Sequence, residues 1–290
     1  MKFVLDDDQR DFAAALESLL SSADTVAAAR AWADGDHGPG LKLWARLAEL
    51  GVLSLATDAT PVEVAVAFEA LGRHAVPGPW VESAAYLPVA LGREVERVAT
   101  VAVPPHVPYA LDADVADQVY IGDTPAGSVG ELHLSVDRTR RLFDVSGQGE
   151  PSRAGFDLAV LATAAQLLGA GERVLADSVT YVQQRKQFGR EIGSYQAIKH
   201  ALADVRIALD FARPLVHGAA LGAVEVSAAK VAAGDAAYLA SRTGLQVHGA
   251  IGYTAEFDLS VWITKIRALV TAWGTPDFHR GRILQQLGAS

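Results

Sequence analysis

Apolar residues recur every three or four positions along most of the second half of this 290-residue chain. This spacing places them on one face of a helix, so it predicts helices rather than strands. Four such helices are expected, with apolar positions within residues 160–182, 198–216, 224–247 and 259–270. Long helices joined by short connections favour an antiparallel four-helix bundle. We therefore expect residues 153–290 to form a C-terminal helical domain.

The first half of the chain mixes helical and alternating patterns. Helical spacing marks residues 6–22, 41–50 and 60–72, and Thr60-Pro61-Val62-Glu63 has the cap, proline and glutamate typical of a helix start. Short alternating runs at residues 100–103, 119–121, 131–136 and 141–145, separated by turn residues, predict a small β unit. We expect an N-terminal helical domain at residues 1–95 and a β domain at residues 96–152.

Composition excludes several classes of function. The net charge of −9 argues against a nucleic-acid partner. The absence of cysteine excludes disulfides and thiolate zinc sites, and we expect no metal. No apolar run approaches the ~18–20 residues that cross a bilayer, so we expect a cytoplasmic protein without a membrane span.

One passage has the composition of a ligand site. Arg185-Lys186-Gln187-Phe188-Gly189-Arg190 follows the first long helix of the second half, and Gln196 opens the next one. A planar guanidinium can grip a phosphate with two hydrogen bonds, and side-chain amides can bind the edge of a polar ring. These residues favour a nucleotide-like ligand.

Together with a second passage, Gln246-Val247-His248-Gly249-Ala250-Ile251-Gly252-Tyr253, this motif resembles the C-terminal domain of acyl-CoA dehydrogenases. Glu69-Ala70-Leu71-Gly72-Arg73 is similar to the N-terminal domain of the same family. The resemblance implies a mainly α fold with a helical N-terminal domain, a middle β domain and a C-terminal four-helix bundle. The β unit here is about half the family's usual size, and it lacks the Trp-Ile-Thr strand that lies beside the flavin.

The resemblance also implies FAD as the cofactor, and ten residues that would contact it. They are Arg185, Gln187, Phe188, Gln196, Gln246, Val247, His248, Gly249, Ala250 and Thr275. Some of them have simpler interpretations. Arg185 could be a cation at a helix end, Gln196 could face solvent, and His248 is better explained as a helix-end residue than as a base.

The family's catalytic base has no counterpart in this chain. Abstraction of the proton beside the thioester needs a carboxylate in a dry pocket. In most members that glutamate comes shortly before a Gly-Thr pair, where this chain has Trp273. Other members place it early in the C-terminal domain, where this chain has Ala159, and nearby Asp157 would point to a different side of the helix.

These features predict a subunit that works with a second acyl-CoA dehydrogenase-like chain. The resemblance implies a heterotetramer with two copies of each chain, which desaturates an acyl-CoA, with sterol-derived CoA esters as a candidate substrate. The partner would supply the glutamate, Trp273 would plug this chain's own pocket, and one FAD would bind per pair of chains. Two alternatives stay open: a flavin-free structural or regulatory partner, and an active homodimer whose base is Glu172, Glu191 or Glu256.

Overall fold

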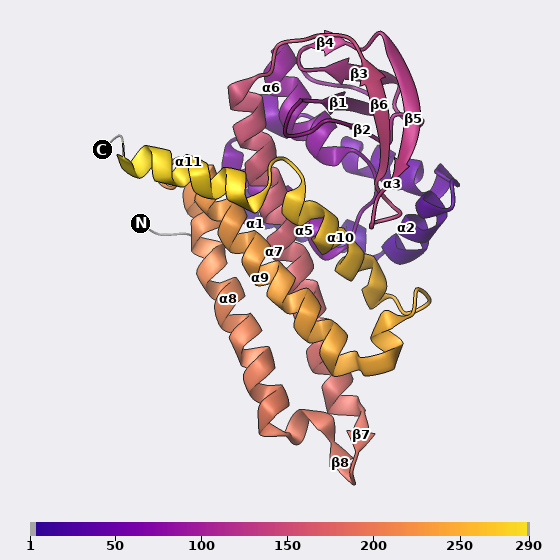
Figure 1. Ribbon diagram of the computed structural model, residues 1–290, viewed down its shortest axis with the longest axis vertical. Coiled ribbons are helices and arrows are strands. Elements are labelled where there is room, and N and C mark those ends of the chain that lie inside the picture. The colour runs from indigo at the N-terminus through magenta and orange to yellow at the C-terminus, as the bar shows by residue number, and fades with distance from the viewer. Residues whose placement is uncertain (1–3, 289–290) are drawn as a thin grey trace.

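The computed structural model describes residues 4–288 and has three parts (Figure 1). N-terminal helices and a small β unit surround one end of a set of long helices, and these long helices extend beyond them. The N-terminal helices are α1 (Asp7–Ser21), α2 (Thr25–Ala33), α3 (Gly38–Glu49), α4 (Leu55–Asp58), α5 (Pro61–Arg73), the π-helical turn η1 (Glu82–Tyr86) and α6 (Leu87–Leu91). The mainly helical fold class is as predicted.

Local capping explains where two N-terminal helices begin. The predicted start at Thr60 is confirmed, because its backbone N–H donates to Glu63 Oε2 at 3.0 Å. α2 was not predicted, because no helix was expected between residue 22 and residue 41. Asp24 caps it by accepting a hydrogen bond from the backbone N–H of Ala27 at 2.9 Å.

The β unit consists of two three-stranded sheets, with strand orders β1-β3-β4 and β2-β6-β5. β1 runs parallel to β3, and the other pairs are antiparallel. The four predicted runs correspond to four of the strands, and two-residue strands β2 and β4 were not predicted. The bounds are β1 (Ala99–Ala102), β2 (Ala110–Leu111), β3 (Gln118–Ile121), β4 (Thr124–Pro125), β5 (Ser128–Leu134) and β6 (Arg141–Ser146).

The C-terminal part contains the four predicted helices and one that was not predicted. They are α7 (Arg153–Gln184), α8 (Gln196–Ala220), α9 (Val226–His248), α10 (Leu259–Thr271) and the additional α11 (Pro276–Gly288). Trp262-Ile263-Thr264 lies within α10 and is therefore not a strand. α7 is the one described helix long and apolar enough to cross a membrane, and 83% of its most apolar stretch is buried inside the protein. This burial is expected of the central helix of a core.

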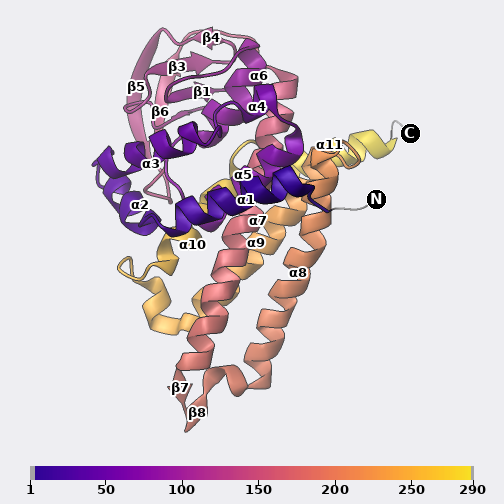
Figure 2. The same ribbon diagram turned by 180° about the vertical axis from the view of Figure 1, so that it is seen from behind.

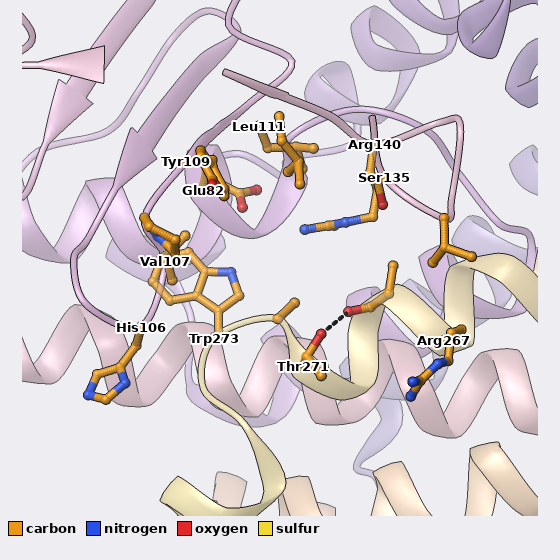
Figure 3. A pocket seen from close by; sticks show the side chains of 15 residues that line it. Glu82, His106, Val107, Tyr109, Leu111, Ser135, Arg140, Arg267, Thr271 and Trp273 are labelled. Atoms are coloured by element: carbon orange, nitrogen blue, oxygen red, sulfur yellow. Dashed lines mark hydrogen bonds between the residues drawn. The ribbon is translucent and has the colours of Figure 1, made fainter. Parts of the chain in front are cut away.

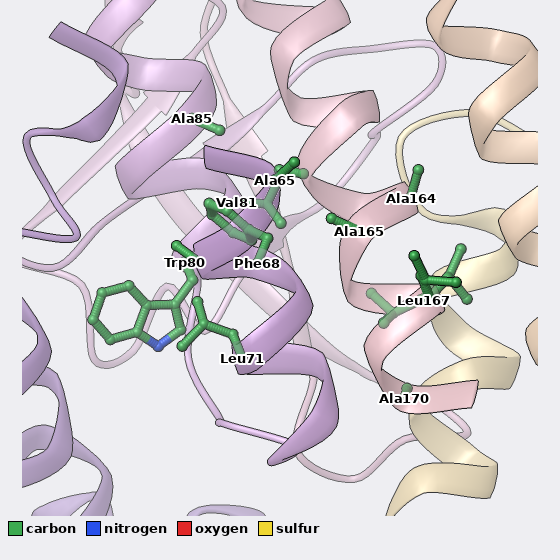
Figure 4. Packing of buried hydrophobic residues seen from close by; sticks show 14 of the residues in the cluster. Ala65, Phe68, Leu71, Trp80, Val81, Ala85, Ala164, Ala165, Leu167 and Ala170 are labelled. Carbon is green, nitrogen blue, oxygen red and sulfur yellow. The ribbon is translucent and has the colours of Figure 1, made fainter. Parts of the chain in front are cut away.

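The N-terminal helices share a hydrophobic core with α7. Phe68 and Leu71 of α5, Trp80, and Ala165 and Leu167 of α7 belong to one cluster of buried hydrophobic residues (Figure 4). The two helices approach so closely that glycine is needed on both. A Cβ added to Gly169 of α7 would lie 1.9 Å from the carbonyl oxygen of Glu69, and one added to Gly72 of α5 would lie 2.1 Å from that of Gln166. The domain boundaries at residues 95 and 152 remain predictions.

Candidate functional site

The residues predicted to contact the cofactor lie at opposite ends of the long helices. Arg185, Gln187, Phe188 and Gln196 lie where α7 joins α8, and residues 246–250 end α9. Figures 1 and 2 place these segments towards the end of the molecule remote from the β unit. Thr275 lies between α10 and α11, beside Trp273 and close to the β unit. A single small ligand cannot contact both ends.

A β-hairpin forms the tip between α7 and α8. Its strands are β7 (Lys186–Gln187) and β8 (Arg190–Glu191), and the two turn residues between them have φ of 52° at Phe188 and 83° at Gly189. Positive φ at both turn positions is typical of a tight hairpin turn. The Phe188 side chain at this turn is 92% exposed. The hairpin therefore presents an unprotected aromatic ring to solvent or to a partner.

Arg185 is available for an external ligand. It is the C-cap residue of α7 and is exposed, so it also meets the expectation for a simple helix-end cation. Within residues 4–288 its guanidinium makes no ion pair shorter than 4.0 Å and no side-chain hydrogen bond. Gln187 and Gln196 are exposed close by in the chain. An exposed cation and two amides thus remain free to bind an anionic or polar group.

The end of α9 divides into buried and exposed positions. His248 is buried, its Nδ1 lies 2.7 Å from the carbonyl oxygen of Gly244, and its ring stacks on Tyr181 at 4.2 Å. Burial lowers the pKa of His248, which favours the neutral ring. His248 therefore has the structural role expected of a helix-end residue. Val247 is also buried, whereas Gln246, Gly249 and Ala250 are exposed.

A cavity of about 460 Å³ lies at the opposite end, between the β unit and the connection from α10 to α11. Figure 3 shows Trp273 on its wall, at the position where the resemblance implies the catalytic glutamate. Trp273 is 1% exposed and lies 5.2 Å from the Tyr86 ring, centroid to centroid. Its φ of +56° is unusual for a residue with a large side chain. Trp273 leaves a substantial cavity beside it, so it does not completely fill this space.

His279 holds the backbone of Trp273 in place. Its Nε2 lies 3.0 Å from the carbonyl oxygen of Trp273, and its Nδ1 lies 2.9 Å from Ser227 Oγ. Thr275 Oγ1 accepts a hydrogen bond from the backbone N–H of Phe278 at 3.2 Å. The predicted cofactor residue Thr275 therefore also acts as a cap for α11.

The carboxylates that the sequence offered as bases lie away from this cavity. Glu172 is bound by two arginines, with Oε1 at 2.6 Å from Arg206 and 2.7 Å from Arg213. Burial would raise the pKa of Glu172, but the hydrogen bonds from these arginines hold it below its usual value. Glu191 pairs with Lys186 in the hairpin, and Glu256 is exposed after α9.

The family's two base positions are occupied by Trp273 and Ala159, so they contribute no carboxylate either. Ala159 is fully buried, and Asp157 forms an ion pair with Arg282 at 2.8 Å. The described carboxylate that does line the cavity is Glu82, which the sequence analysis missed. It is 1% exposed; burial raises the pKa of its carboxyl, and the Arg140 charge and the nearby Trp273 indole act in the opposite direction. The signal in the sequence was a lone acidic residue within the apolar run from Trp80 to Leu91.

Comparisons with known proteins agree with this architecture. Residues 152–288 match the sequence profile of the acyl-CoA dehydrogenase C-terminal domain. The acyl-CoA dehydrogenase IpdE2 of Mycobacterium tuberculosis is 30% identical over 282 residues, which cover 86% of this chain and 87% of that protein.

Two of the solved structures with a similar fold are complexes of two different proteins. The ChsE4–ChsE5 complex from Mycobacterium tuberculosis has a chain that matches with a TM-score of 0.83 at 20% identity, covering 100% of both chains. A chain of the Tcur3481–Tcur3483 steroid acyl-CoA dehydrogenase matches with a TM-score of 0.81 at 19% identity, covering 98% of this chain and 99% of that one. At such identities the likeness shows a common fold.

Proposed function

Because the chain belongs to the acyl-CoA dehydrogenase family, we propose that it is one subunit of a two-chain, FAD-dependent acyl-CoA dehydrogenase in the cytoplasm. The reaction is the α,β-desaturation of an acyl-CoA thioester. A base removes a proton from the carbon beside the thioester, and FAD supplies the acceptor for the hydride that leaves the next carbon. In this proposal the base comes from the partner chain, and this chain contributes cofactor contacts and an interface.

The observation that carries the proposal is the separation of the predicted cofactor residues from the chain's own cavity. α7 has 32 residues, which corresponds to about 48 Å at 1.5 Å per residue. It extends from Phe156, which contacts Trp273, to Arg185 at the hairpin. Arg185 and its neighbours therefore lie too far away to serve a cofactor beside Trp273. In the proposed assembly they serve a cofactor held mainly by another chain.

The exposed residues at the hairpin end suit the polar parts of FAD. The Arg185 guanidinium can bind the diphosphate, and the amides of Gln187, Gln196 and Gln246 can donate to or accept from polar groups. Gly249 has a φ of 62°, and a Cβ there would meet nothing within 4 Å. The backbone at the end of α9 is thus open to close approach. In the proposed role, these groups bind and orient the cofactor and perform no proton transfer.

The lack of a base in the usual places supports the assignment of catalysis to a partner. Trp273 cannot accept the proton, and Ala159 has no polar side-chain atom. The named pairs ChsE4–ChsE5 and Tcur3481–Tcur3483 support a heteromeric assembly, and we propose two copies of each chain. The second pair is a steroid acyl-CoA dehydrogenase, which supports a sterol-derived CoA ester as the substrate class.

Co-expression tests the proposal. This chain, carrying the only tag, is expressed with a candidate acyl-CoA dehydrogenase-like partner from the same organism, and flavin absorbance is measured per mole of each purified chain. We expect equal amounts of both chains with about one FAD per pair. Arg185→Ala should reduce the flavin content of the complex, whereas the matched Arg93→Ala, an exposed arginine of the N-terminal part, should not.

Two results would favour the alternatives. An intact but colourless complex would indicate a structural or regulatory partner. A homodimer with one FAD per protomer would indicate an active enzyme formed by this chain alone. That second candidate gains one observation from the structure, since Glu82 is a buried carboxyl on the cavity wall. Its distinctive result would be turnover by the homodimer that Glu82→Gln abolishes.

A further inference from the structure

Tyr181 connects the two segments that contain most of the predicted cofactor contacts. It lies on α7 one turn before Arg185, whose backbone N–H donates to the Tyr181 carbonyl oxygen at 2.9 Å. Its ring stacks on that of His248, the last residue of α9, with 4.2 Å between the ring centroids. This aromatic pair therefore links the end of α7 at the hairpin to the end of α9, where Gln246 and Gly249 lie.

A third ring extends this contact across the connection from α9 to α10. The Phe257 centroid lies 5.2 Å from that of His248 and 6.5 Å from that of Tyr181. Between His248 and Phe257 the chain forms a loop, residues 249–256, in which every residue except Gly252 is exposed. A Cβ added to Gly252 would lie 3.1 Å from the His248 Cβ, so the loop folds closely against this histidine. The three rings form an aromatic cluster that contacts both ends of the loop.

The aromatic cluster lies where the close packing of α7 against α9 ends. Nearer the middle of the two helices, a Cβ added to Gly244 would lie 2.7 Å from Val174 Cγ1. Towards the tip, residues 183–191 are all exposed. Because the hairpin and the loop are both largely exposed, the position of Arg185 relative to the loop depends on the contacts within the cluster.

Arg30 provides a second tether for the loop. Its Nη2 donates to the carbonyl oxygen of Glu256 at 2.7 Å, and its guanidinium pairs with Asp258 at 2.8 Å. Arg30 belongs to α2 in the N-terminal part. This tether therefore holds the far end of the loop to the N-terminal helices and does not set its distance from the hairpin.

A ligand that contacts both segments needs them at a fixed spacing. Binding groups must be held within about 0.5 Å of their productive positions, and packing of their supporting side chains is what holds them. The Tyr181 hydroxyl makes no hydrogen bond within residues 4–288, so the ring supplies the contact. Aromatic pairs have preferred geometries, which makes such a stack a directional contact.

We propose that Tyr181 is a positioning residue for the cofactor. By stacking on His248, its ring holds Arg185 and the loop at the spacing that one bound FAD requires. The inference rests on the proposed function, because it takes FAD to bind at this end of the molecule. It goes beyond that function by giving a role to a residue outside the predicted set of cofactor contacts.

The affinity of the co-purified complex for FAD tests the role of the ring. Tyr181→Leu removes the stack, and we expect the Kd for FAD to rise roughly five- to tenfold. Tyr181→Phe keeps the ring, so its Kd should stay within about twofold of the unmodified value. Val64→Ala is the matched control, since it opens a cavity in the buried part of α5. It should lower the midpoint of urea unfolding and leave the Kd within about twofold.

A double substitution separates positioning from a general loss of stability. If the Tyr181 ring acts by placing Arg185, its loss matters less once the guanidinium is absent. We therefore expect Tyr181→Leu to change the Kd less than about twofold in the Arg185→Ala background. An equal effect of Tyr181→Leu in both backgrounds would overturn the inference.

Further outcomes distinguish the inference from the proposed function. If the unmodified complex binds FAD and Arg185→Ala weakens it, equal affinity in Tyr181→Leu and Tyr181→Phe would overturn the inference alone. A complex that binds no FAD would overturn the proposed function and the inference with it. Phe257→Leu provides a second test where Tyr181→Leu fails to fold, because it loosens the aromatic cluster from the loop. It should raise the Kd roughly threefold, and an unchanged Kd would count against the inference.

Discussion

Replacing Gly169 with alanine tests the closest contact between the N-terminal helices and the C-terminal part. The added Cβ would lie 1.9 Å from the Glu69 carbonyl oxygen, 2.8 Å from the Glu69 carbonyl carbon and 2.9 Å from the Arg73 backbone nitrogen. All three atoms belong to the backbone of α5, so no side-chain rotation relieves the clash. The helices must separate by roughly 1 Å, which disrupts the packing on both sides.

The expected loss of stability follows from two opposing terms. Overpacking of this severity costs about 3–5 kcal/mol, because tightly packed helices cannot absorb it locally. Alanine returns up to about 1 kcal/mol through its higher helix propensity. We therefore expect the free energy of unfolding to fall by about 3 kcal/mol, measured by urea denaturation followed by circular dichroism and tryptophan fluorescence.

A second glycine provides the matched control. Gly234 lies in α9, is also buried, and a Cβ there would meet nothing within 4 Å. Gly234→Ala should therefore leave the free energy of unfolding unchanged or raise it by up to about 1 kcal/mol. If Gly169→Ala proved as stable as Gly234→Ala, the close contact between α5 and α7 would be incorrect.

Two other substitutions test buried charge and buried histidine. Glu172→Gln should lower the free energy of unfolding by about 1–2 kcal/mol, because Arg206 and Arg213 lose the charge of their shared partner but keep Asp210 and Glu69 as partners. The exposed Glu256→Gln should have little effect in the same urea assay. Burial is the largest cause that lowers the pKa of His279 to about 4, so between pH 6.5 and 4 the unfolded chain binds a proton that the folded chain does not. Stability should fall over that range and fall less in His279→Gln, and parallel pH profiles for the two proteins would contradict this.

The sequence predicted the elements with the strongest periodicity. α7, α8, α9 and α10 were expected because long runs of apolar residues repeat at helical spacing. α11 was missed because its apolar residues are few and Gly281 interrupts it, so the clear helical spacing ends at residue 270. β2 and β4 contain two residues each, which is too short for an alternating pattern. Tertiary pairing with neighbouring strands is what makes them strands.

The candidate sites differ in how far sequence could define them. Arg185 and Gln187 stand together in a motif, so their position at the end of one helix was predictable. Glu82, Arg140 and Trp273 come from three distant parts of the chain, and only the packing of the β unit against α10 brings them to one cavity. No pattern of neighbouring residues in the sequence predicts that these three side chains lie at one cavity. The lone acid in an apolar run was the one hint, and it does not identify its neighbours.

The length of α7 has a consequence for how such proteins can diverge. Substitutions that are far apart and share no contacts usually have independent effects on stability. The cavity around Trp273 and the hairpin around Arg185 are separated by nearly the whole of this helix. After duplication of an ancestral gene, one copy could therefore lose its catalytic acid without harm to the surface around its hairpin. Selection would then preserve both genes, since neither protein alone would supply both the catalytic acid and all of the cofactor contacts.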